Sequence, residues 1–101
     1  MLILAGIKYK FLSSPWQYNS NGGWVFVSLP LTLSKEIREH FQQEEQGWGR
    51  LKVTAQTGNS VWKSSIWWDS KTMQYLLPLK AEVRIKENII IDFPIDVIIT
   101  I

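Results

Sequence analysis

The chain has 101 residues, with 11 Lys and Arg against 9 Asp and Glu, and this size fits one small globular domain. The absence of cysteine excludes thiolate nucleophiles, disulfides and cysteine-ligated metal sites, and a single histidine, His40, excludes multi-histidine catalytic metal sites. The net charge of +2 permits nucleic-acid binding but does not favour it.

The first residues do not predict a membrane segment. The apolar run 1–7 is too short to span a bilayer, and it lacks the basic stretch that opens a signal peptide. We therefore expect a soluble, cytoplasmic chain that does not associate with membranes.

In the first half of the chain, period-two alternation predicts a strand over residues 3–12 whose odd positions, such as Tyr9, face the core. After a turn-rich segment, residues 24–29 are apolar on both faces, which predicts a central strand covered on two sides. Ser34 is the expected N-cap of a helix, and Gly47 is its expected end.

In the second half, two alternating runs join at Gly58 and predict a β-hairpin over residues 51–67. A short strand is expected over 74–77 and one or two helical turns over 80–86. The alternation of Ile and Val in 95–101 predicts a last strand.

Two segments of the sequence are nearly the same. VFVSLPLTLSKEIR (25–38) and MQYLLPLKAEVR (73–84) both contain strand residues, a Leu-Pro-Leu step and a helix start with Glu and Arg. The repeat predicts a mainly β fold with two short helices, a pseudo-two-fold double-split β-barrel built from two strand, Leu-Pro, helix, strand units. We expect a single domain, 1–101, with repeat halves of approximately 1–58 and 59–101. The structural repeat positions are Pro30, Arg38, Pro78 and Arg84.

This repeated unit resembles half of the AbrB/MazE-type swapped-hairpin barrel of DNA-binding regulators. The sequence is more similar to a bacterial family known only as domain of unknown function nineteen-oh-five, which carries both halves in one chain. The resemblance implies a double-split β-barrel with two short helices and no established activity. It covers about 9–101 and rests on the strings GGWVFVSLP (22–30), EIR (36–38), GWGRLKVTAQTGNSVWKSSI (47–66) and YLLPLKAEVR (75–84).

The chain departs from the family at one point, where Asp92-Phe93-Pro94 replaces the usual Gly-Asp before the last strand. A pairing of Arg84 with a turn aspartate would then use Asp92. By the repeat, Arg38 and Arg84 invite two interpretations: a symmetric anion site, or structural arginines that hydrogen-bond turns or carbonyl groups.

Two sets of residues resemble catalytic pairs but have the wrong geometry for catalysis. Ser60 and Lys63 match the Ser-x-x-Lys spelling of acylating enzymes, yet in a strand they point to opposite faces. Asp92 and Asp96 would be separated by about 13 Å along a strand, beyond the reach of a paired acid and base. We therefore expect no enzyme, no cofactor and no metal.

The tryptophans give the one unusual signal. The candidate ligand or partner surface consists of Arg50, Lys52, Trp62, Lys63, Trp67 and Trp68, because aromatic and cationic side chains together bind planar or anionic ligands and protein partners. The alternative is that tryptophans are core fillers, which we expect for Trp16, Trp24, Trp48 and Trp62. The pair Trp67-Trp68 is then the part exposed for binding.

The sequence therefore predicts a non-enzymatic module that binds an unknown small ligand or protein, as a monomer or weak homodimer. DNA binding by analogy with the swapped-hairpin regulators is the alternative, and the modest net charge argues against it.

Overall fold

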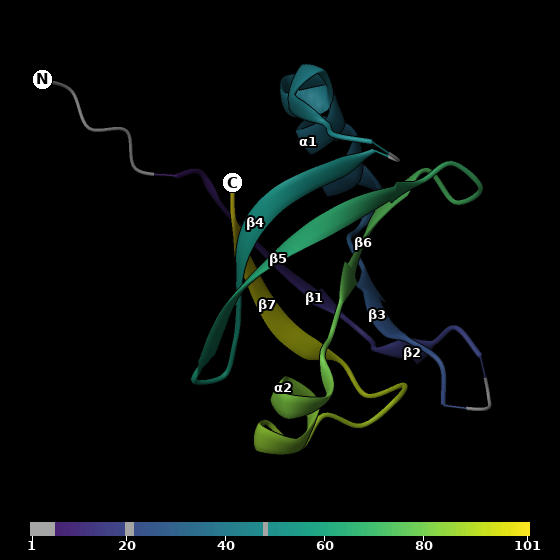
Figure 1. Ribbon diagram of the computed structural model, residues 1–101, viewed down its shortest axis with the longest axis vertical. Coiled ribbons are helices and arrows are strands. Elements are labelled where there is room, and N and C mark those ends of the chain that lie inside the picture. The colour runs from purple at the N-terminus through teal and green to yellow at the C-terminus, as the bar shows by residue number, and fades with distance from the viewer. Residues whose placement is uncertain (1–5, 20–21, 48) are drawn as a thin grey trace, which may run out of the picture.

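The computed structural model describes residues 6–19, 22–47 and 49–101, and these ranges form seven strands, two α-helices and one short 3-10 helix (Figure 1). The predicted mainly β fold with two short helices is confirmed. In chain order the elements are β1 (Lys8–Ser13), β2 (Trp16–Gln17), β3 (Val25–Ser28), α1 (Leu31–Phe41), η1 (Gln42–Glu44), β4 (Arg50–Thr57), β5 (Ser60–Asp69), β6 (Gln74–Pro78), α2 (Ala81–Lys86) and β7 (Ile95–Thr100).

The seven strands form one antiparallel sheet in the order β1-β7-β4-β5-β6-β3-β2. Only Ser14 and Pro15 separate β1 from β2, so one stretch of chain pairs with β7 at one end of this order and with β3 at the other. Pro15 is buried at the bend, and Ser13 Oγ donates a hydrogen bond to the Ser28 carbonyl at 2.7 Å. The sheet therefore curls round into a barrel-like wall (Figure 1).

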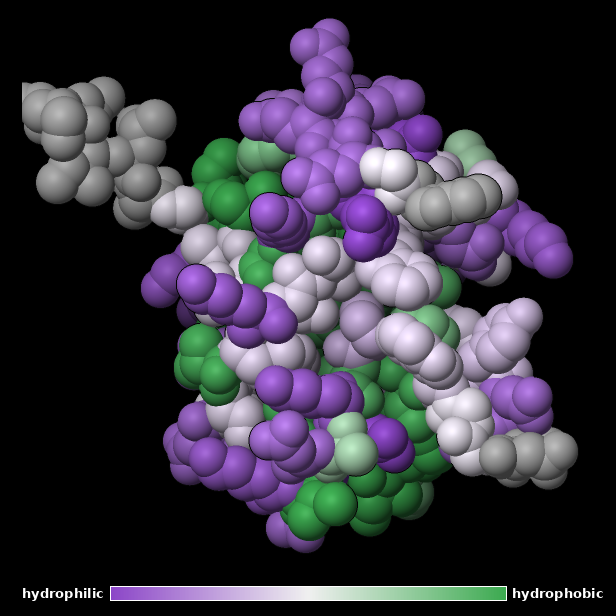
Figure 2. Space-filling model, in the orientation of Figure 1, coloured by the Kyte–Doolittle hydropathy of each residue, from purple (hydrophilic) through white to green (hydrophobic). Residues whose placement is uncertain are grey.

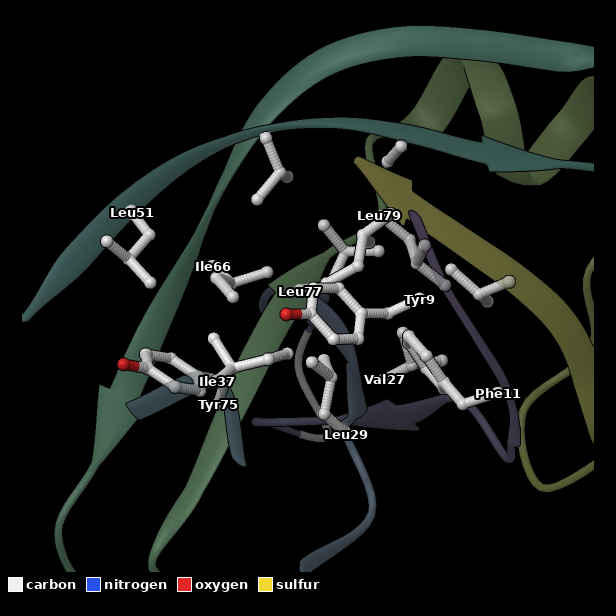
Figure 3. Close-up of a cluster of buried hydrophobic side chains, with 14 of the residues drawn as sticks. Tyr9, Phe11, Val27, Leu29, Ile37, Leu51, Ile66, Tyr75, Leu77 and Leu79 are labelled. Atoms are coloured by element: carbon white, nitrogen blue, oxygen red, sulfur yellow. The ribbon is translucent and has the colours of Figure 1, made fainter. Parts of the chain in front are cut away.

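The hydrophobic core fills the inside of this curl. Leu51 and Ile66 point inward from the β4–β5 hairpin, toward Leu77 and Tyr9 on other strands (Figure 3). Tyr9 and Phe11 are both buried, as the alternation in the first strand predicts. Residues 3–5 of that predicted strand lie outside the described residues.

The β4–β5 hairpin has the predicted two-residue turn at Gly58-Asn59. Its register runs from the pair Thr57 and Ser60 at the turn to the pair Arg50 and Trp67 near the open end. Because side chains alternate between the two faces of a strand, this register places Trp62 and Ile66 in the core and Lys63 and Ser65 on the outer face.

The pairing of β3 with β6 relates the two repeats. The Leu29 amide donates to the Tyr75 carbonyl at 2.9 Å, and the Leu79 amide donates to the Val25 carbonyl at 2.8 Å. The two bonds are equivalent under a shift of 50 residues, because Leu29 then corresponds to Leu79 and Val25 to Tyr75. Helices α1 and α2 also begin 50 residues apart, at positions 31 and 81.

The repeat prolines occupy different places in this symmetry. Pro30 is the N-cap of α1, whereas Pro78 is the last residue of β6, and Lys80 is the N-cap of α2. The Leu-Pro-Leu spelling therefore marks both strand ends, but it aligns residues that are two positions out of structural register.

Helix α1 begins earlier than predicted, and Ser34 is not its N-cap. Proline has a backbone angle suited to a helix start, and Pro30 caps α1 with φ −53°. Ser34 instead lies buried inside the helix, where its Oγ donates to the Leu29 carbonyl and accepts a hydrogen bond from the Tyr75 amide. The hydroxyl thus joins α1 to β6.

The helix also ends before Gly47. It gives way to η1 after Phe41, and Glu45 then adopts an extended conformation with ψ 134°. This early end carries Glu45 back toward the sheet, where it contacts Tyr75 and Arg38. Neither α-helix in the described residues has the length and apolar character needed to cross a membrane.

Candidate ligand-binding surface

The outer face of the β4–β5 hairpin carries a shallow groove of about 790 Å³. Arg50, Lys52, Lys63 and Trp67 line it, together with uncharged residues of β4 to β7. Their positions follow from the register, because Arg50 lies opposite Trp67 and Lys52 lies opposite Ser65. In Figure 2 this face shows hydrophilic side chains separated by paler residues, whereas hydrophobic surface gathers near α2. We call this site the basic groove.

The basic groove unites four of the six residues of the predicted surface. The other two, Trp62 and Trp68, point to the opposite side of the sheet. Trp62 is buried in the core, as expected for a filler. Trp68 packs against the core with its ring 5.0 Å from that of Tyr75 in an edge-on arrangement, so the expectation that Trp67 and Trp68 form one exposed pair is wrong.

Trp68 belongs to a network beneath α1. The guanidinium carbon of Arg38 lies 4.0 Å from the centre of its ring, a cation–π contact. Arg38 Nη1 is 3.8 Å from Glu45 Oε2, and the Tyr75 hydroxyl donates a hydrogen bond to the same oxygen. Burial, followed by this hydrogen bond and by the charge of Glu45, raises the pKa of Tyr75.

The ion pair in this network is long. At 3.8 Å the ion pair is too long for a hydrogen bond, and the buried Nη1 of Arg38 has no hydrogen-bond partner in the described part of the chain. Arg84 has a different setting, because its Nε donates to the Leu79 carbonyl at 3.0 Å. The two arginines therefore do not form a symmetric anion site, and hydrogen bonding to a carbonyl accounts for Arg84.

The expected partner of Arg84, Asp92, is engaged elsewhere through its backbone. The Asp92 amide donates to the Pro15 carbonyl at 2.9 Å, and its φ is +71°. The turn at Asp92 thus ties the approach to β7 to the bend between β1 and β2.

Beside the basic groove, the outer face of β3 carries an aromatic cluster that the sequence did not reveal. Phe26 is at its centre, with ring centroids 5.3 Å from Trp16, 5.9 Å from Trp24 and 6.4 Å from Trp67. Trp24 is also 5.6 Å from Trp67. The rings line a hollow of about 450 Å³, which we call the aromatic hollow, with lining residues Trp16, Tyr18, Trp24, Phe26, Trp67, Asp69, Lys71 and Leu76.

Two of the expected core tryptophans are therefore surface residues. Trp24 is 58% exposed, and Trp16 is half-buried on the outer face, where its Nε1 donates to Ser28 Oγ at 2.9 Å. Trp48 lies outside the described residues. The apolar residues on both faces of the strand 24–29 could have predicted the cluster. Val25 and Val27 lie in the core, so the Phe26 side chain points to the other face and must be covered there by other apolar side chains. The tryptophans supply that cover in place of a second layer.

The residues that resemble catalytic pairs do not come together as pairs. Ser60 is buried and its Oγ donates to Glu87 Oε2 at 2.6 Å, while Lys63 is exposed on the other face. Asp92 and Asp96 are both exposed, one in a turn and one in β7. Among the described residues, no three His, Cys, Asp or Glu side chains gather in a way that would hold a metal ion.

The chain was compared with known proteins in two ways. A search of curated proteins found no match. A family model does match, over residues 11–99, which takes in the hairpin, both helices and the strands that line the basic groove. The similarity to AbrB/MazE domains and the bacterial source stay predictions. Because the family model matches residues 11–99, the chain belongs to the family described as a domain of unknown function (DUF1905).

Proposed function

We propose that this chain is a non-enzymatic binding module whose ligand combines a planar ring with a negative charge. The observation that carries the proposal is the position of Trp67, which lines both the basic groove and the aromatic hollow. A ligand bound there meets a ring face and a set of cations at the same time.

The charges around Trp67 favour an anion. Arg50, Lys52 and Lys63 line the basic groove, and no Asp or Glu side chain is among the described residues that line it. All three side chains are exposed, so the cations are available to a ligand from solvent. Arginine forms paired hydrogen bonds with carboxylate and phosphate groups, and lysine supplies a point charge.

The rings favour a planar group. Trp24 is exposed and lies nearly parallel to Phe26, at 18° between the ring planes, so a fixed ring beneath it holds its orientation. Trp16 is held in turn by its hydrogen bond to Ser28. Aromatic surface that is already fixed costs little conformational entropy on binding.

The proposal includes one ligand per chain, with the protein a monomer or weak homodimer. Two-dimensional ¹⁵N NMR tests it with 2-naphthalenesulfonate as the planar anion and 2-naphthol as its neutral counterpart. We expect the anion to shift amide signals of β4 and β5 around Arg50 and Trp67, and the neutral compound to bind more weakly.

Variants sharpen this test. Trp67→Ala should abolish the shifts, and Lys63→Ala should weaken binding. Val61→Ala is the control because Val61 is exposed on the same face of β5 but does not line either hollow. Equal binding by Trp67→Ala and Val61→Ala would contradict the proposal.

A further inference from the structure

A third hollow extends the surface beyond the aromatic hollow. Its volume is about 310 Å³, and its lining includes Trp24, Lys80 and Arg84. We call it the helix hollow, because Lys80 caps α2 and Arg84 lies within that helix. Trp24 lines both this hollow and the aromatic hollow, as Trp67 lines both the aromatic hollow and the basic groove.

The three hollows therefore lie in a row, which we call the track, with Trp67 between the first two and Trp24 between the last two. Along the sheet, the track runs from β4 and β5 across β6 and β3 to the start of α2. Adjacent strands are about 4.8 Å apart, so the distance from β4 to β3 alone is about 14 Å. A ligand that uses the whole track is longer than one ring and one charged group.

The charge along the track is strongly one-sided. Six of the 11 Lys and Arg residues of the chain line it, against one of the nine Asp and Glu residues. The net charge of +2 conceals this asymmetry because the remaining acids lie elsewhere. The cations are Arg50, Lys52, Lys63, Lys71, Lys80 and Arg84.

The single Asp or Glu side chain in the described lining already accepts hydrogen bonds within the chain. Asp69 Oδ1 accepts a hydrogen bond from the Lys71 amide at 3.2 Å, and Oδ2 accepts one from Thr72 Oγ1 at 2.8 Å. Both carboxylate oxygens of Asp69 thus accept hydrogen bonds from the turn between β5 and β6, which partly offsets its negative charge.

We propose that the track binds single-stranded nucleic acid, with bases stacked on Trp67 and Trp24 and phosphates beside the cations. This inference rests on the proposed function and names its ligand class. Repeated phosphates and planar bases match a surface that carries cations together with the exposed ring of Trp24 and the half-buried ring of Trp67. A double helix keeps the faces of its bases stacked inside, so it offers the two tryptophans no base to stack on. An acidic peptide likewise lacks the planar groups.

The test is fluorescence anisotropy with labelled oligothymidylate and oligouridylate, from the dinucleotide to the octanucleotide, titrated with the full chain. We expect affinity to rise with length until about four nucleotides are bound, the lower end of the range for small barrels. If three to six phosphates are neutralised, the logarithm of affinity should fall with the logarithm of salt with a slope of about −2 to −4.

Two variants separate the roles of rings and charges. Trp67→Ala should weaken binding about five- to one-hundred-fold, and Trp67→Phe should restore part of it, because each stacked base contributes strongly to affinity. Lys63→Ala should lower the salt slope by about 0.7, whereas Lys35→Ala, an exposed lysine on α1 outside the three hollows, should leave it unchanged. Circular dichroism of each variant establishes that it is folded.

Several results would contradict nucleic-acid binding. Equal affinity for a duplex of the same length, equal affinity for polyglutamate, or no effect of Trp67→Ala would overturn the inference. If 2-naphthalenesulfonate binds but oligonucleotides show no gain with length, nucleic-acid binding fails and the proposed function stands. If neither probe binds, both fail.

Discussion

Trp67 and Trp68 are neighbours in the chain, yet their rings serve opposite sides of the sheet. Trp68 packs against Tyr75 and beneath Arg38, with the core behind it. Trp67 lies on the outer face against Trp24 and Phe26, and lines two hollows. The difference shows that one strand, β5, separates the residues that stabilise the fold from those available for binding.

The largest effect should come from the inner face. Ile66 is fully buried, so Ile66→Ala should lower the free energy of unfolding by about 2–5 kcal/mol through lost burial and a new cavity. Lys63→Ala, on the outer face of the same strand, should change it by no more than about 0.5 kcal/mol. Urea denaturation measures both, and similar losses in the two variants would contradict the separation of the faces.

A smaller effect is expected in the network beside Trp68. Tyr75→Phe removes the hydroxyl that donates to Glu45 and leaves a largely buried carboxylate short of a donor, which should cost about 1–3 kcal/mol. The same denaturation series measures this loss. A variant as stable as the parent would show that the hydrogen bond is unimportant.

Tyr75 also predicts a pH dependence. Its pKa is raised above 10.0 in the folded chain, so the unfolded chain loses this proton first as the pH rises. Stability from this group is therefore complete below pH 10 and declines above it. Tyr9, whose pKa is raised by burial and by Glu36, acts in the same direction. The decline should be shallower in Tyr75→Phe, and an unchanged slope would count against the effect.

The smallest effect concerns the turn that sets the register, and hence which tryptophan faces outward. Gly58 has φ +56°, and a Cβ there would meet the Glu87 carboxylate that Ser60 holds. Gly58→Ala should lower stability by about 1–2 kcal/mol because alanine is strained in this conformation. Gly47→Ala is the control, since a Cβ at Gly47 meets open space. Thermal unfolding compares the two, and equal melting temperatures would contradict this account.

Several elements were predictable because local pattern specified them. The alternation of residues 51–67 around Gly58 predicted the hairpin, its turn and the inward position of Trp62. It also placed Lys63 and Trp67 on one face. The helix start was mispredicted because Ser34 has the chemistry of an N-cap, but in the fold its hydroxyl bonds to β6.

The aromatic hollow was beyond a local pattern, because its rings come from three separate strands and one loop. Trp24 looked like a core residue because it precedes a buried strand. In the structure its ring packs on Phe26 and Trp67 at the surface. Trp67 comes near Trp24 only because β3 pairs with β6 and β6 pairs with β5. These pairings, together with that of β4 with β5, also bring the six cations of the track to one surface.

The sequence by itself determined the mainly β class, the repeat, and which side of each strand is apolar, because alternation along a strand is a local property. It also determined that cysteine and multi-histidine chemistry are absent. Only the tertiary structure decided that Trp67 and Trp24 meet across the sheet while Trp68 turns to the core. The reason is physical: strand order and register are set by the packing of the whole barrel, and they alone bring distant side chains to one surface.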